Sequence, residues 1–295
     1  MGRPRRALRL RRRRLRSGPL VDPAAGRLKP ACSPTADAMG DALNAEWTKL
    51  RTLASTYWLL LAVAVLTVGV STAVVVTISY QPNAYQGTPR LALSGIDLGQ
   101  AVVAVLAVLV ISNEYSTGMM CTTLTAMPRR LVMLGAKAAT LTGLVAIAGE
   151  VAVGGSLLAG RAILPGNGFT VAHGYPLLSL GHGPTLRAAV GSVLYLVLVA
   201  LLSVGIATAV RESAMAIGTV LGLLYLLPLL AQVVSDPAWQ RHLEQIAPMT
   251  AGLSIQATTK LQSLPISPWA GLGVLAVWSA GALFIGGLLL NVRDA

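Results

Sequence analysis

Side chains that could carry out chemistry are few in this chain. The three histidines, His173, His182 and His242, are too few and too loosely spaced for a metal site. No nucleophile, base and orienting group occur at a recognisable spacing, although such groups can assemble from distant positions. The chain has no G-x-x-x-x-G-K-S/T phosphate loop; the nearest string, GSLLAGR at Gly155–Arg161, lacks the lysine and the hydroxyl and indicates helix packing. We therefore expect no catalytic residue, no metal site and no ATP site in the chain itself.

One carboxylate lies inside a long apolar run. Glu150, in the string AIAGEVAVGG, is near the middle of that run, where an ionised carboxylate is costly unless it is paired or hydrated. We therefore expect its side chain to face the interior of a helix bundle. Two interpretations stand side by side: a polar point on the path of a transported molecule, or a protonated or hydrogen-bonded residue that packs helices. Arg161 lies near the end of the run, so we expect it to reach the interface rather than to pair with Glu150.

A polar stretch, VISNEYSTGMMCTTLTAMPRR at Val110–Arg130, separates two apolar runs. Ser116 or Thr117 can cap a short helix, which Pro128 ends. Three apolar residues recur along this helix at helical spacing: Met120, Leu124 and Met127. Arg129 and Arg130 follow at its C-terminal end, where the helix dipole favours positive charge. Such a stripe fits two placements, in a groove on a partner protein or back on the lipid headgroups.

The composition is that of an integral membrane protein. Of 295 residues, 54% are hydrophobic and 12% are charged, and the mean hydropathy of +0.68 exceeds that of ordinary soluble domains. The net charge of +12 is local, because nine of the 23 Lys and Arg residues lie between Arg3 and Arg16, so we expect no nucleic-acid partner. Cys32 and Cys121 fall in segments that we place on the cytoplasmic side, so we expect no disulfide.

Residues 1–38 are rich in Arg, Pro and Ala, and we expect a disordered basic tail. No apolar segment of the kind found in signal peptides follows the arginines. Either the tail binds anionic lipid, or native translation begins at Met39, which we favour because patterned sequence starts there. Mass spectrometry of the native N-terminus would separate the two. Residues 39–295 then form one transmembrane domain.

The pattern from Asp41 to Ser55 predicts an amphipathic helix. Apolar residues recur along it at spacings of four, three and four: Leu43, Trp47, Leu50 and Ala54. The helix either lies in the cytoplasmic headgroup layer, with Trp47 inserted and Lys49 and Arg51 against phosphates, or extends the first span into the cytoplasm.

Six apolar runs follow, each about long enough to cross a hydrocarbon core of roughly 30 Å. They are residues 57–79, 95–112, 135–164, 186–210, 214–234 and 269–290. Because the period-2 alternation of a barrel is absent, we expect six helices, the third of them overlong. With both termini cytoplasmic, seven basic residues outside the tail lie inside and five lie outside, which is a weak positive-inside bias. The turn-rich loops then lie outside, and the 110–130 stretch and the VRES connection lie inside.

Several strings together resemble the membrane permease subunits of the type-two ABC exporter group, especially its short actinobacterial-like members. They are AEWTKLRT at 45–52, NEYSTGMMCTTLTAMPRR at 113–130, KA at 137–138, PW and G at 268, 269 and 271, and the terminal RDA at 293–295. The resemblance covers residues 40–295. Its most specific part is the Glu-Tyr-x-x-Gly pattern of Glu114, Tyr115 and Gly118, between the second and third of six spans.

The resemblance implies an all-α, six-helix permease with an N-terminal interface helix and a cytoplasmic coupling helix that docks on a separate ATPase subunit. Trp47, Lys49 and Arg51 would belong to the interface helix. The coupling residues would be Glu114, Tyr115, Gly118, Met120, Leu124, Met127, Arg129 and Arg130. Glu114 would anchor the segment through Arg51, Arg129 or Arg130, and the loop with APMTAG at 247–252 would contain short re-entrant helices.

The implied function is the transmembrane half of an ATP-driven exporter in the plasma membrane, without an ATPase site of its own. Two permeases, identical or paralogous, would pair with two ATPase chains, which bind ATP and Mg²⁺, within membrane lipid. One alternative is an ion-coupled secondary transporter that uses Glu150 as its proton site. Another is a non-transporting membrane scaffold or immunity component. An adjacent reading frame with ATPase motifs would favour the exporter.

Overall fold

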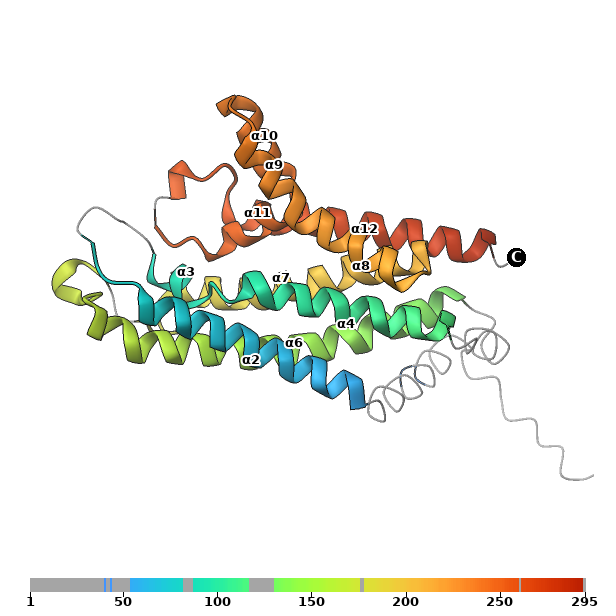
Figure 1. Cartoon of the computed structure of the whole chain (residues 1–295), viewed down its shortest axis with the longest axis horizontal. Coiled ribbons are helices and arrows are strands. Elements are labelled where there is room, and N and C mark those ends of the chain that lie inside the picture. The colour runs from blue at the N-terminus through green and yellow to red at the C-terminus, as the bar shows by residue number, and fades with distance from the viewer. Residues whose placement is uncertain are drawn as a thin grey trace, which may run out of the picture.

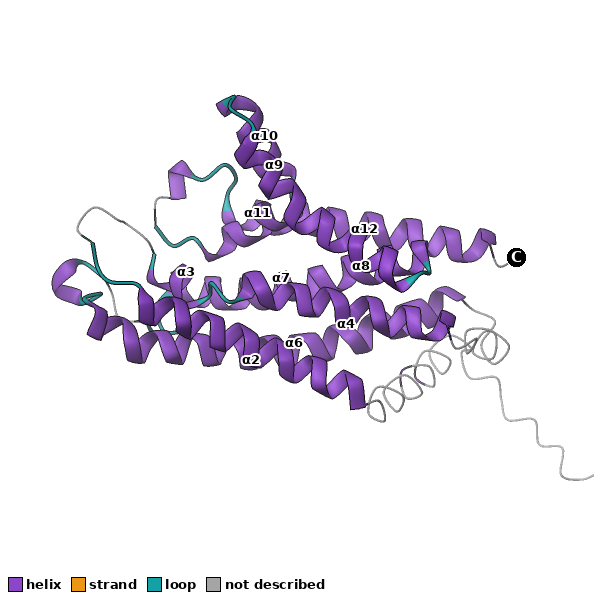
Figure 2. Ribbon diagram, in the orientation of Figure 1, coloured by secondary structure: helices purple, strands orange, loops and turns teal. Residues whose placement is uncertain are grey.

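The computed structural model describes residues 40, 43, 54–81, 87–116, 130–175, 178–259 and 261–293. Within these ranges the chain is helical and contains no strand (Figure 2). Six helical stretches are long and apolar enough to cross a membrane, which indicates a multi-pass membrane protein and confirms the six predicted spans. They are α2 (Ala54–Thr77), α4 (Ile96–Ser116), α6 (Arg130–Ile163), α7 (Gly183–Val210), a fifth composite helix and α12 (Pro268–Arg293).

The third span is overlong, as the sequence predicts. Helix α6 has 34 residues, or about 51 Å at 1.5 Å per residue. The fifth span is interrupted, which the sequence analysis did not anticipate. It consists of α8 (Ser213–Leu221), a π-helical turn at Gly222–Leu226 and α9 (Leu227–Val233). A π turn contains an extra residue and redirects the helix after it.

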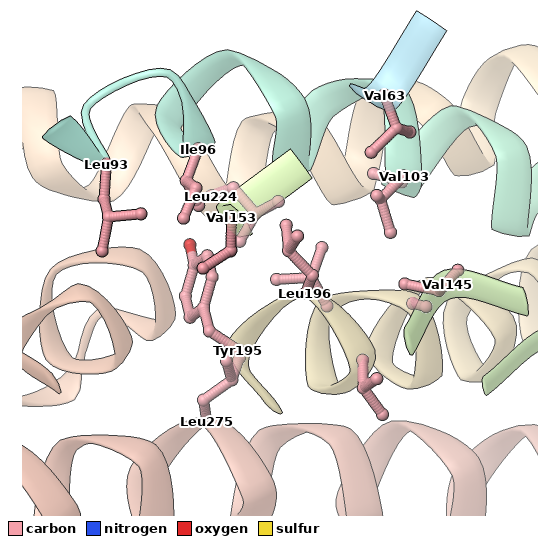
Figure 3. Packing of buried hydrophobic residues seen from close by; sticks show 14 of the residues in the cluster. Val63, Leu93, Ile96, Val103, Val145, Val153, Tyr195, Leu196, Leu224 and Leu275 are labelled. Carbon is pink, nitrogen blue, oxygen red and sulfur yellow. The ribbon is translucent and has the colours of Figure 1, made fainter. Parts of the chain in front are cut away.

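Helix α7 is the centre of the bundle and packs against α4, α6, α8 and α12 (Figure 1). Helix α2 packs against α4 and α6 on one side of it. The core is built from branched aliphatic side chains and one fully buried aromatic residue, Tyr195 of α7, whose hydroxyl group points toward α4 (Figure 3). Every other described span therefore contacts α7 directly or through one neighbour.

Glycines set the distance between α4 and α2. A Cβ at Gly95 would lie 2.0 Å from the Thr67 carbonyl oxygen, and one at Gly99 would lie 2.2 Å from Thr67 Oγ1. The Gly95 amide also donates a hydrogen bond of 3.0 Å to Ser71 Oγ. The other glycine pair at this spacing, Gly218 and Gly222, has no atom within 4 Å of its built Cβ positions. Of these two pairs, only Gly95 and Gly99 lie at a close contact between helices.

The two ends of the bundle differ. At one end, called here the α4–α6 end, α4 ends and α6 begins, and the chain's C-terminus lies nearby (Figure 1). The opposite end carries α3 (Thr88–Ala92), α10 (Pro237–Ile246), α11 (Pro248–Leu253) and the loop between α6 and α7. There Asn167 Nδ2 donates a hydrogen bond of 2.7 Å to the Val75 carbonyl oxygen, and Tyr80 stacks on His173 with ring centroids 4.4 Å apart. These contacts tie the α6–α7 loop to the end of α2.

Several sequence predictions lie outside the described residues. They are the basic tail at 1–38, most of the helix at 41–55 with Trp47, Lys49 and Arg51, both cysteines, and Gly118, Met120, Leu124, Met127 and Arg129. The side chains of Glu114 and Arg130 also lie outside the description, although their backbones end α4 and begin α6.

Candidate functional site

Tyr115 lies where four helices come together. It is in the last turn of α4, and a small cavity beside it is lined by residues of α4, α6, α7 and α12: Ile111, Tyr115, Met133, Leu134, Lys137, Thr208 and Leu290. Helix α8 follows α7 after two residues. Since residues 117–129 connect α4 to α6, this junction stands at both ends of the segment for which the sequence predicts a short helix.

Arg211 covers the ring of Tyr115. Its guanidinium carbon lies 5.3 Å from the ring centroid, which is within the range of a cation–π interaction. Arg211 ends α7 with a φ of 65°, the left-handed conformation that an L side chain adopts at a cost, and its amide donates a hydrogen bond of 2.9 Å to the Ala207 carbonyl oxygen. The sharp end of α7 thus places the cation over the end of α4.

Glu212 begins the next helix directly. Its two carboxylate oxygens accept hydrogen bonds from the amides of Ala214 and Met215, at 3.0 and 2.6 Å. These bonds satisfy amides that have no partner within the first turn of α8. The VRES string is therefore a rigid connection, in which one residue ends α7 and the next caps α8.

Lys137 is a buried part of the same junction. It lies within α6, more than a turn beyond the start of the helix, and only 3% of its surface is exposed. A charged group at such a position must be compensated by polar neighbours. This burial could not be predicted, because α6 has no distinct polar face that would indicate which side meets its neighbours.

Glu150 does not face the interior of the bundle, so that expectation is wrong. Its side chain is exposed on the surface of α6. The preceding residue, Gly149, packs against α7, with its built Cβ position 3.4 Å from Leu196 and 3.6 Å from Val193. Successive helix residues are about 100° apart around the axis, so contact at Gly149 turns Glu150 to the side.

A groove between α6 and α7 contains Glu150. Its volume is about 850 Å³, and the loop at 178–181 closes it at one end. Apolar side chains of both helices form most of its wall, and its polar residues are Thr142, Glu150, Arg161, Ser179 and Thr185. Both contacts of Gly149 lie near the middle of α7, which places the carboxylate at mid-depth in the bundle.

A second polar cluster joins α4, α7 and the π turn. The Tyr195 hydroxyl donates a hydrogen bond to the side-chain oxygen of Gln100, and the Tyr225 hydroxyl donates one to the backbone carbonyl of Asp97. Gln100 Nε2 donates to the same carbonyl at 3.2 Å. The sequence analysis missed this cluster. Its signal was the pair Asp97 and Gln100, one turn apart at the start of an apolar run.

Comparison with protein families and with curated proteins gave no match. No protein-family model matches the chain, and no curated protein matches it. The fold alone defines the class: the described residues form a helical membrane protein with six candidate spans. Its candidate sites are the Tyr115 junction at the α4–α6 end and the Glu150 groove on the α6–α7 surface.

Proposed function

We propose that the chain is the permease subunit of an ATP-driven exporter and couples to a separate ATPase subunit through residues 117–129. One observation carries the proposal: four helices meet around Tyr115 at the two ends of this segment. The order of the strings that resemble the type-two ABC exporter group supports it. ATP and Mg²⁺ would be bound by the partner, and a second permease, identical or paralogous, would complete the transporter.

The packing offers a route from the coupling segment to the spans. Closure of the ATPase dimer would displace residues 117–129, and α4 and α6 would move because they continue directly from that segment. Arg211 on Tyr115 would pass the movement to the α7–α8 connection. Since α7 packs against four other spans, its displacement would rearrange the bundle and open a path at the interface between two permeases.

The test is to purify the tagged full chain from native membranes with its associated ATPase. We expect Leu124→Glu and Glu114→Ala to reduce ATPase association or to abolish ATP-dependent export, while the protein remains in the membrane. The matched control is Leu261→Glu, a leucine in a loop at the opposite end of the bundle that is 43% exposed. Normal association and export in both coupling variants would refute the assignment.

A second candidate function, ion-coupled transport, is favoured by the exposure of Glu150 in a mid-depth groove. Purified protein in liposomes with a pH gradient and no ATPase separates the two. Uptake or release that depends on the gradient and on Glu150 would establish the secondary transporter. Its absence, together with ATP-dependent export in the complete complex, would establish the exporter.

A further inference from the structure

The groove between α6 and α7 combines an apolar wall with a single acidic group. We propose that it binds a lipophilic cation, whose positive charge lies against Glu150 and whose apolar body lies along α6 and α7. This inference rests on the proposed function in one respect only, which is that it takes the bound cation to be the exported molecule. Pockets of a few hundred to about 1,000 Å³ with few polar groups are typical of sites for small organic ligands.

The described part of the chain supplies no cation to Glu150. Among the described residues the carboxylate makes no hydrogen bond or ion pair, and the groove's only other charged residue is Arg161. Eleven residues separate the two, so they lie on one face of α6 three turns, or about 16 Å, apart. An unpaired carboxylate at mid-depth in a membrane is costly. A positive charge brought by a ligand removes that cost.

The shape of the groove leaves room for the apolar body beside the carboxylate. Gly154 lies one turn after Glu150 on the same face, and its built Cβ position has no atom within 4 Å. A Cβ at this position would project into the groove without a close contact, so a larger side chain there would take up space in the groove. Gly143 also has open space around it but does not line the groove, so it provides a matched control.

The surroundings of the groove favour access from the lipid. Apolar residues of α6 next to the groove are strongly exposed: Ile147 at 59%, Val151 at 61% and Leu158 at 69%. In a membrane these side chains contact acyl chains, where a lipophilic cation concentrates. Arg161 stands at the closed end of the groove and repels a positive charge there, so the preferred position of the cation is at Glu150.

The experiment measures equilibrium binding of radiolabelled tetraphenylphosphonium to the full chain in nanodiscs, without ATP or ATPase. Tetraphenylborate, which has the same shape and the opposite charge, is the matched ligand. We expect saturable binding of the cation and not of the anion. In Glu150→Gln the cation loses its charged partner, so we expect its affinity for the chain to fall about tenfold to a hundredfold. Gly154→Leu should abolish binding. Two controls should leave binding unchanged: Gly143→Leu, outside the groove, and Glu244→Gln, which removes a carboxylate from α10.

Three results would overturn the inference. The first is the absence of saturable cation binding, and the second is equal affinity of the cation for Glu150→Gln and the original chain. The third is efficient disulfide cross-linking of Leu158→Cys between two copies, which would show that a second chain covers the groove. The proposed function fails separately. If the cation binds as expected but no ATPase associates with the chain, the site stands and the exporter does not; if ATP-dependent export persists without cation binding, the reverse holds.

Discussion

A single added methyl group should separate α7 from α12. A Cβ at Gly205 would lie 2.4 Å from the Ala282 carbonyl carbon and 2.5 Å from the Leu283 amide nitrogen. Carbon atoms in contact are ordinarily 3.5 to 4.0 Å apart, so in Gly205→Ala the two backbones must separate by about 1 Å. From the other side, a Cβ at Gly286 would lie 2.6 Å from the Gly205 carbonyl oxygen. No side-chain rotation relieves contacts with backbone atoms.

The matched variant is Gly218→Ala, in α8, where nothing lies within 4 Å of the built Cβ. Replacing a helical glycine with alanine contributes about 1 kcal/mol of helix propensity in both variants, so this contribution cancels in the comparison. The remaining difference is the cost of overpacking, about 1 to 3 kcal/mol, and we expect the upper part of that range. Unfolding of the full chain in mixed micelles with increasing dodecyl sulfate, followed by tryptophan fluorescence, measures it. Equal free energies of unfolding for the two variants would refute the reasoning.

Three further predictions concern the Tyr115 junction, the polar cluster of α4, α7 and the π turn, and the α6–α7 loop. Arg211→Ala should impair ATP-dependent export more than Arg241→Ala, an exposed arginine on α10, because only the first removes the cation from Tyr115; vesicle export assays at equal protein amounts test this. Tyr225→Phe should lower the free energy of unfolding by about 1 kcal/mol, since it loses the hydrogen bond to the Asp97 carbonyl; an unchanged value in the micelle titration would contradict it. Asn167→Ala should speed amide hydrogen exchange in the loop after α6, because it frees that loop from α2.

The six spans could be predicted because their cause is local. Backbone groups in hydrocarbon must be satisfied within the segment, so each apolar run of sufficient length becomes a helix. The run at 135–164 predicted an overlong third helix, and α6 is overlong. The predicted ends of the spans differ from the observed ends by a few residues, because caps and turns rather than hydropathy decide where a helix begins.

The direction of Glu150 could not be predicted because α6 is apolar on all sides. With no polar face, the sequence does not indicate which side of the helix meets its neighbours. The contacts of two glycines decide it: Gly149 meets α7, and Gly155 meets Val68 of α2 with a built Cβ distance of 2.8 Å. With these two contacts made, Glu150 lies in the groove between α6 and α7. Close approach at a glycine depends on the partner helix, which a single sequence does not name.

The interruption of the fifth span has a local signal that the prediction of the spans did not use. Pro228 follows the string GLLYL at 222–226; because proline has no amide hydrogen, the carbonyl of Leu224, four residues earlier and within the π turn, receives no helical hydrogen bond from it. The turn is accompanied by the hydrogen bond from Tyr225 to the Asp97 carbonyl, a contact between residues 128 positions apart. Unlike the proline, this contact leaves no pattern in the local sequence.

Helix α6 extends from the α4–α6 end of the bundle to the loop at the opposite end. Its length of about 51 Å exceeds a hydrocarbon core of roughly 30 Å by about 20 Å, so a helix close to the membrane normal would project into water. An α-helix resists compression along its axis because every turn is closed by hydrogen bonds. An axial push at Arg130 would therefore arrive at Ile163 almost undiminished, and from there at the loop that Asn167 and His173 fasten to α2. A probe attached to that loop would report, from one side of the membrane, on events at the other.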